Sequence, residues 1–204
     1  MKNPIKYLAG LALTVFMVAG ITTVATAQVG PAASPPGSTF DQRLAQRKNE
    51  RKIVLEEKDV KRLVSQCSRA QTELRKVQTE VRQLSSRRTE TYRTVDGKLW
   101  MAVGLLKLGG VDTFKLERQR AAYIQNVEGF QTIIKEYQQA IDDTVVINCG
   151  ADPIGFKALL DTSRIYQTQL INQSATIRNL LVNEIKPTLS EHTTDLQPKS
   201  AGEN

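Results

Sequence analysis

LLKLGGVD, residues 105–112, contains the only double glycine in the sequence, Gly109-Gly110. Two successive glycines favour a chain reversal, because glycine adopts backbone conformations that other residues avoid. The two cysteines lie almost equally far from this turn, Cys67 42 positions before Gly109 and Cys149 39 positions after Gly110. A helix that folds back at the glycines would bring the two thiols level. The sequence therefore predicts a helical hairpin closed by a Cys67–Cys149 disulfide.

The N-terminal segment has the organisation of an export signal. Lys2 and Lys6 precede an apolar run over residues 7–21, and Ala25-Thr26-Ala27 supplies the small residues of a cleavage site. We expect residues 1–27 to be a signal peptide removed before Gln28. The alternative is an uncleaved membrane anchor, because residues 7–25 carry no charge. Both alternatives predict an exported protein that is periplasmic, secreted or at the cell surface.

The expected export bears on the state of the two cysteines. In an oxidising compartment two cysteines without a third are most simply one disulfide. The alternative is that Cys67 and Cys149 are small apolar residues of the core. Two cysteines and the single histidine cannot supply the four ligands of a structural zinc site. No metal and no cofactor is expected.

Composition divides the remaining chain into three parts. Residues 28–38 are rich in Pro, Gly and Ser and are expected to form a linker. Residues 39–186 carry helical periodicity and are expected to form one coiled-coil domain. Lys186-Pro187 is expected to stop the last helix, because proline cannot donate the helical hydrogen bond. The polar, aperiodic residues 187–204 are expected to be a disordered tail.

Three stripes of apolar residues recur at steps of three and four, as in the seam of a coiled coil. The first is Ile53, Val60, Leu63, Cys67, Ala70, Leu74, Val77, Val81 and Leu84; the second is Leu116, Tyr123, Val127, Phe130, Ile134, Tyr137 and Ile141; the third is Phe156, Leu159, Tyr166, Leu170, Ile177, Leu180 and Leu181. Asp152-Pro153 begins the third helix with a capping carboxylate and a proline at the first helical position. The predicted fold is all-α, an elongated antiparallel helical hairpin that a third helix makes into a three-helix coiled coil.

The register of these helices predicts two exposed ends. A third helix that stops before Pro187 would end near the level of Val95, so the hairpin tip would have only two helices. At the other end, residues 40–62 would extend beyond their own chain as an overhang. Ile53 and Val60 lie on the seam of this overhang and are predicted self-association residues.

The tip is the predicted interaction site. Residues 99–108 carry one charge and the only tryptophan, and exposed apolar patches of this kind mark binding surfaces. The residues predicted to interact are Leu99, Trp100, Met101, Val103, Leu105, Leu106 and Leu108. Two alternatives stay open: helix three or a second molecule covers this surface as core, or a foreign protein partner or the membrane surface binds it.

Charge is uneven along the chain. Residues 41–93 hold 15 basic and 8 acidic residues, whereas residues 94–195 hold 10 and 12. The basic residues of the overhang are Arg43, Arg47, Lys48, Arg51, Lys52, Lys58, Lys61 and Arg62. They could bind anionic lipid or another polyanion, or they could pair with the acidic residues between them. Export and the lack of a recognised motif argue against nucleic acid.

Signals of catalysis are weak. The single histidine, His192, lies in the expected tail, and Asp142, Asp143 and Asp152 lie near helix ends, where carboxylates usually cap helices or face solvent. We therefore expect a non-enzymatic scaffold or adaptor that associates with protein partners at the cell envelope. The alternative is an extracytoplasmic holdase chaperone or lipid-binding protein that uses the apolar tip.

Overall fold

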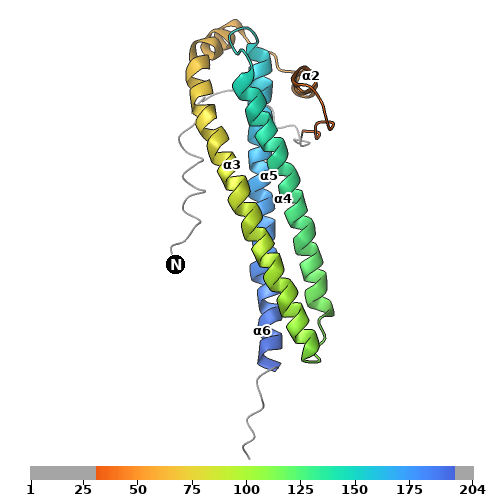
Figure 1. The fold of residues 1–204 in the computed structure, drawn as a ribbon. Helices are drawn as coiled ribbons and strands as arrows, with labels where there is room; N and C mark the ends of the chain where they lie inside the picture. The colour runs from red at the N-terminus through yellow and green to blue at the C-terminus, as the bar shows by residue number, and fades with distance from the viewer. Residues whose placement is uncertain (1–30, 196–204) are drawn as a thin grey trace, which may run out of the picture. The chain divides into compact units, whose positions relative to one another are not determined.

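The computed structural model describes residues 31–195, and this part consists of helices and their connections (Figure 1). In chain order the elements are α2 (Phe40–Arg51), α3 (Glu57–Leu108), α4 (Phe114–Val146), α5 (Pro153–Asn179), the π-helical segment η1 (Leu180–Ile185) and α6 (Lys186–Asp195). Both α3 and α5 pack chiefly on α4, and they make fewer contacts with each other. The predicted all-α helical bundle is confirmed, whereas the predicted signal peptide, residues 1–27, lies outside the described residues.

The double glycine ends α3 and reverses the chain. Gly110 has a φ of 74°, which lies in the left-handed region that favours glycine. The N–H of Gly110 donates to the Lys107 carbonyl and that of Val111 to the Leu106 carbonyl, both at 3.0 Å. This pair of hydrogen bonds is a Schellman motif, which satisfies carbonyls at the end of the helix. The predicted turn is therefore built by the local chemistry of Gly110.

The disulfide closes the other end of the hairpin. Cys67 of α3 and Cys149, in the connection from α4 to α5, are bonded with a Cα–Cα distance of 5.8 Å. This distance is within the range of unstrained disulfides. The Asn148 side chain shapes the connection, since its Oδ1 accepts from the Gly150 and Ala151 amides at 3.1 Å. The two arms of the hairpin therefore match in length, and the predicted pairing of Cys67 with Cys149 is confirmed.

Aromatic residues fill the interface between α3 and α4. Tyr92 contacts Tyr123 and Phe130 edge to face, with ring centroids 6.5 Å and 5.2 Å apart. The Tyr123 hydroxyl donates to the Tyr92 carbonyl at 3.0 Å, and burial raises the pKa of Tyr123 above its ordinary value. A satisfied hydroxyl allows a tyrosine to be buried without an unpaired polar group. Most residues of the second and third predicted stripes are likewise buried.

The third helix continues beyond Pro187, contrary to the expectation of a stop there. η1 leads directly into α6, which runs to Asp195 along the end of the hairpin (Figure 1). Ile185 and Thr188 are buried, and Lys115 of α4 forms an ion pair with Glu191. The wider π turn separates the proline ring from the carbonyl that it would meet in a regular α-helix. The predicted tail boundary at 187 and the two-helix tip are therefore wrong.

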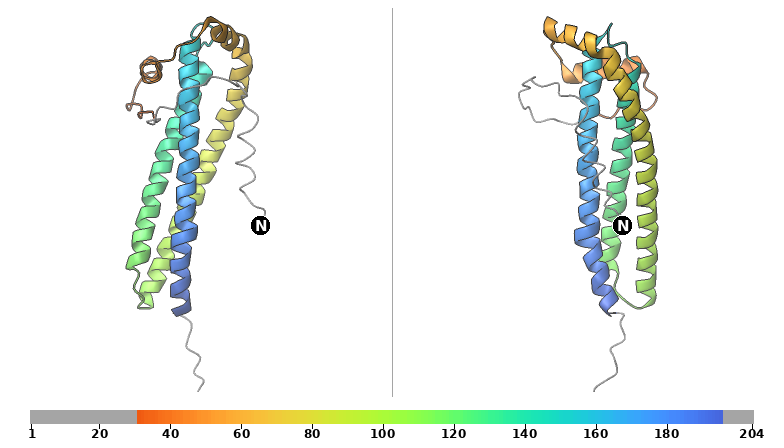
Figure 2. Two further views of the ribbon diagram at one scale, coloured as in Figure 1. Left: turned by 180° about the vertical axis from the view of Figure 1, so that it is seen from behind. Right: turned by 90° about the vertical axis from the view of Figure 1, so that its left-hand side faces the viewer.

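The predicted overhang is also wrong, because the chain bends between α2 and α3. Lys52 ends α2 with a φ of 44°, and α3 begins at Glu57. The bend brings α2 back onto α5 (Figure 2). Part of the predicted linker also contacts the bundle, since the Ser34 amide donates to Glu136 of α4 at 3.3 Å. Among the described residues no helix is long and apolar enough to cross a membrane.

Candidate functional site

The structure divides the predicted tip residues between two faces of α3. Leu99, Val103 and Leu106 are buried against the bundle. Four others point outward, with exposed fractions of 65% for Trp100, 53% for Met101, 68% for Leu105 and 87% for Leu108. The end of α3 is therefore apolar on both sides. Core packing explains only the inner side, so the outer side is the candidate interaction surface.

The four outward side chains and Gly104 share one face of α3, which we call the outer tip face. Their spacing at 100, 101, 104, 105 and 108 follows the period of an α-helix over two turns. They border a shallow depression of about 550 Å³ together with Lys107. A Cβ atom built on Gly104 would meet none of the surrounding atoms within 4 Å, so no described residue occupies the space above it.

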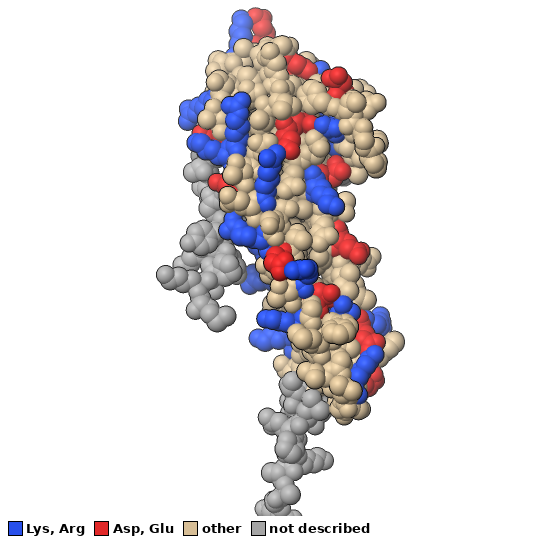
Figure 3. Space-filling model, viewed as in Figure 1, with Lys and Arg blue, Asp and Glu red and all other residues tan. Residues whose placement is uncertain are grey.

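Charged side chains border this surface without covering it. Lys107 forms an ion pair with Glu117 of α4 at 2.6 Å, which directs its ammonium toward the bundle. That carboxylate accepts hydrogen bonds from Lys107 and from the Thr113 hydroxyl, and both lower the pKa of Glu117. Figure 3 shows a largely uncharged surface at the hairpin end with basic and acidic groups beside it. The outer tip face is thus apolar with a polar border.

A second constellation joins α2 to the bundle. The Arg43 guanidinium donates to both carboxylate oxygens of Asp143 in α4, at 2.7 Å and 2.6 Å. It also donates to the Ser38 carbonyl. The hydrogen bond with Asp143 raises the pKa of Arg43 above its ordinary value, and Gln139 donates to Asp143 at 3.0 Å. Two parallel hydrogen bonds between a guanidinium and a carboxylate fix the orientation of both groups.

Arg47, one turn further along α2, is 3% exposed. Its guanidinium donates to the Ala32 carbonyl at 2.7 Å, Glu50 Oε2 at 2.9 Å, Ser34 Oγ at 3.0 Å and the Tyr166 hydroxyl at 3.2 Å. Tyr166 in turn donates to Glu136 at 3.2 Å. Burial raises the pKa of Tyr166 to about 12, with Glu136 acting in the same direction and Arg47 opposing it. Arg47 is thus one buried cation at which three parts of the chain meet: residues 32–34, α2, and the pair of helices α4 and α5.

Lys48 completes the attachment of α2. Its ammonium lies 2.6 Å from Asp152, the residue that caps α5 by accepting from the Gly155 amide at 2.9 Å. Burial alone would raise the pKa of Asp152, but the hydrogen bonds from Lys48 and from Gly155 outweigh it and lower the pKa. The predicted capping role of Asp152 is confirmed, and the carboxylate has a second role in binding α2.

Most of the predicted basic stripe is paired within the chain. Besides the three contacts of α2, ion pairs join Lys58 to Glu56, Lys61 to Glu57 and Arg62 to Asp59. The structure therefore supports pairing of these cations with acidic residues, and it does not support a free cationic stripe. Ile53 and Val60, the predicted self-association residues, are half-buried near the bend. The unpartnered overhang on which that prediction rested does not exist.

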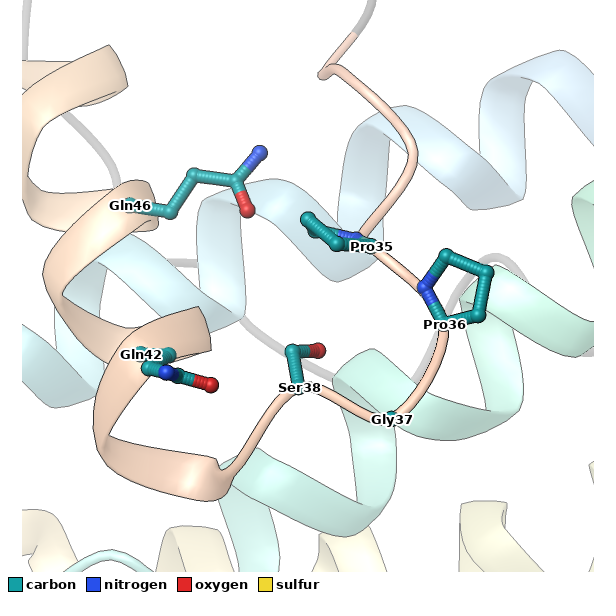
Figure 4. Close-up of a pocket in the computed structure, with 6 residues that line it drawn as sticks. All are labelled: Pro35, Pro36, Gly37, Ser38, Gln42 and Gln46. Atoms are coloured by element: carbon teal, nitrogen blue, oxygen red, sulfur yellow. The ribbon is translucent and has the colours of Figure 1, made fainter.

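A metal centre requires a cluster of ligand side chains, and a binding site for a small molecule requires a cavity. Within residues 31–195, no group of three or more His, Cys, Asp and Glu side chains could hold a metal ion. A shallow depression of about 440 Å³ lies between the start of α2 and the segment before it (Figure 4). Its lining residues are Pro35, Pro36, Gly37, Ser38, Gln42 and Gln46, none of which is titratable.

No protein family model, no curated protein sequence and no solved structure matches this chain. Two features of the fold bear on function, the outer tip face and the attachment of α2. Sequence reasoning located the outer tip face by its composition. It missed the attachment of α2 because Arg43 and Asp143 are 100 positions apart, and a mixed charge pattern does not indicate which distant partners meet.

Proposed function

We propose that this protein is an exported helical scaffold or adaptor whose outer tip face binds an amphipathic helix of a protein partner. The observation that carries the proposal is the exposure of Trp100, Met101, Leu105 and Leu108 on one face of a disulfide-closed bundle. Tryptophan and methionine are favoured at binding surfaces that exclude water. The N-terminal sequence and the disulfide both support an oxidising compartment outside the cytoplasm.

The geometry favours a helix as the bound element. The outer tip face extends over two turns of α3, about 12 Å at 1.5 Å per residue. Gly104 lies in its middle and presents no side chain, so a second helix could approach closely there, as small residues permit at helix contacts. The polar border would match the polar flanks of an amphipathic helix. No titratable cluster suggests chemistry on the ligand.

Gly104→Gln tests this surface with little risk to the fold. A side chain at this position enters open space, and replacing a helical glycine favours the helix. Gly97→Gln is the matched control, since Gly97 is exposed in the same helix and also has open space above it. A helical side chain leans toward the N-terminus, so the glutamine at 104 would cover the apolar face whereas that at 97 leans away from it.

The measurement has two stages. Cross-linking in the native envelope with wild type and both variants as bait should identify a partner that only Gly104→Gln loses. With the purified partner, Gly104→Gln should weaken the dissociation constant at least about tenfold, and Gly97→Gln should leave it nearly unchanged. Equal binding by all three proteins would refute the proposal. Binding of anionic vesicles or unfolded clients, lost in the same variant, would instead favour the lipid-binding or holdase alternative.

A further inference from the structure

The bend between α2 and α3 begins at a left-handed helix cap, in which the Lys52 amide donates to the Lys48 carbonyl at 2.9 Å. Residues 52–56, Lys-Ile-Val-Leu-Glu, contain neither glycine nor proline. Lys52 is nevertheless the one non-glycine residue with a positive φ in the described part of the chain. Glu56, which precedes α3, makes no side-chain capping hydrogen bond. A left-handed residue without glycine persists only where the surrounding structure imposes it.

Three basic residues of α2 hold it on the bundle beyond this bend. Arg43, Arg47 and Lys48 bind Asp143, the Tyr166–Glu136 pair and Asp152. In the bend itself Val54 is 93% exposed. A continuous helix through residues 52–56 would relieve Lys52 and place Ile53 one heptad before Val60 on the seam of α3. A continuous helix is thus the alternative to the bend, and the contacts of α2 with the bundle favour the bend.

We propose that α2 is an exchangeable arm that leaves its own bundle and occupies the same surface of a second copy. Residues 52–56 then join α2 and α3 into one helix, and the exchange is reciprocal, which gives a two-fold dimer. The occupant must be another α2. The vacated surface exposes the carboxylates of Asp143, Glu136 and Asp152 and the hydroxyl of Tyr166. The positions of these groups match the spacing of Arg43, Arg47 and Lys48 on α2. Asp143 would otherwise lose the Arg43 guanidinium, which donates to both of its carboxylate oxygens.

Charge reversal separates exchange from simple release. Arg43→Asp places a carboxylate against Asp143, and Asp143→Arg places a guanidinium against Arg43, so neither single variant can attach its own α2. In an exchanged heterodimer of the two, Asp at 43 meets Arg at 143, and the native Arg43 meets the native Asp143. Both contacts are restored only between different chains. The double variant Arg43→Asp/Asp143→Arg restores the pair within one chain and is the control for folding.

The single variants, the double variant and a one-to-one mixture are compared by light scattering and native mass spectrometry. We expect the single variants and the double variant to be mainly monomeric, and the mixture to form a heterodimer in which α2 becomes resistant to protease. A mixture that stays monomeric with a protease-sensitive α2, while the double variant folds, overturns the proposal.

If the charge-reversed variants do not fold, wild type and two variants of Lys52 test the proposal instead. Lys52→Gly removes the strain of the bend, and Lys52→Ala favours the continuous helix. At equal high concentration the dimer fraction should rank Ala above wild type above Gly, with at least about a tenfold difference between the extremes in the dimerisation constant. The same dimer fraction in all three proteins overturns the exchange. The outcome is independent of the outer tip face, which these variants leave intact.

Discussion

At the scale of single residues, Arg47 is the most deeply buried of the three cations that attach α2. A buried guanidinium costs free energy unless its donors are satisfied, and here backbone, hydroxyl and carboxylate acceptors surround it. Removal of this cation would take away the hydrogen bond that the Tyr166 hydroxyl accepts and the ion pair with Glu136, whose charged atoms lie 3.7 Å apart. The position is therefore sensitive in a way that exposed arginines of α3 are not.

Arg47→Met should lower the free energy of unfolding by about 2 kcal/mol, because the methionine fills the space but leaves buried polar groups unpaired. Urea unfolding followed by circular dichroism measures the change. The exposed Arg75 provides the control, and Arg75→Met should change the free energy by less than about 0.5 kcal/mol. Equal effects of the two substitutions would mean that the Arg47 cluster contributes no net stability.

The carboxyl group of Asp152 should report the contact with Lys48. Its pKa is lowered in the folded protein, so its stabilising effect is complete above the unfolded value of about 3.9 and is lost as the pH falls through the lower folded value. Carbon-13 NMR of the carboxyl group should show a midpoint below 3.8 in wild type, which Lys48→Met raises. Lys61→Met should leave the midpoint in place, because Lys61 pairs with Glu57 and has no part in the shift of Asp152. An unchanged midpoint in Lys48→Met would contradict the contact.

At the scale of the elements, the continuation of the third helix determines what the hairpin end buries. η1 adds one π turn and α6 then covers the start of α4, with Thr188 inside and Lys186 and Pro187 outside. The hydroxyl of Thr188 donates to the Glu184 carbonyl at 3.0 Å, which satisfies it within its own helix. A residue that follows a proline in the sequence is thus part of the core.

Thr188→Lys should lower the free energy of unfolding by about 2–3 kcal/mol, because it forces a charge into a buried position. Asn183→Lys, which is exposed in η1, is the control and should cost less than about 0.5 kcal/mol. Thermal and urea unfolding measure both variants. If the two lysines are tolerated equally, α6 does not pack on α4.

The elements also show where sequence reasoning succeeds and where it fails. Gly110 and the Asp152-Pro153 pair act through local chemistry, so the ends that they mark were predicted. Pro187 acts locally as well, but the π turn before it removes the clash that would stop a helix, and the spacing of apolar residues does not reveal that turn. The bend at Lys52 could not be predicted, because neither glycine nor proline marks it and the contacts that hold α2 join Arg43 and Arg47 to residues far away in the sequence.

The candidate surface was predicted only in part for a similar reason. The composition of residues 99–108 indicated an apolar tip, but it could not separate Leu99, Val103 and Leu106 from their neighbours on the outside. That division depends on which face of α3 turns toward α4, and α3 is apolar on both sides at this level. Where the whole circumference of a helix is apolar, the spacing of apolar residues no longer shows which face is buried.

At the scale of the whole molecule, the disulfide joins residues 82 positions apart. Replacing Cys67 and Cys149 together by serine should lower the free energy of unfolding by about 2–4 kcal/mol, because closing a long loop restricts the unfolded chain. Chemical unfolding under non-reducing conditions measures the loss, and wild type in reductant should match the double variant. Two free thiols in protein taken from its own compartment would contradict the bond.

The same bond also decides how the molecule would respond to mechanical tension. A force applied before α2 and after α6 would pass from α3 through the Cys67–Cys149 bond into α5, so the hairpin between the two cysteines would bear no load. About 280 Å of extended chain, at roughly 3.4 Å for each of the 82 steps, is thereby withheld from stretching. Reduction would release this length at once. The cystine therefore makes the tip mechanically isolated, and the outer tip face would keep its shape while the rest of the chain is pulled.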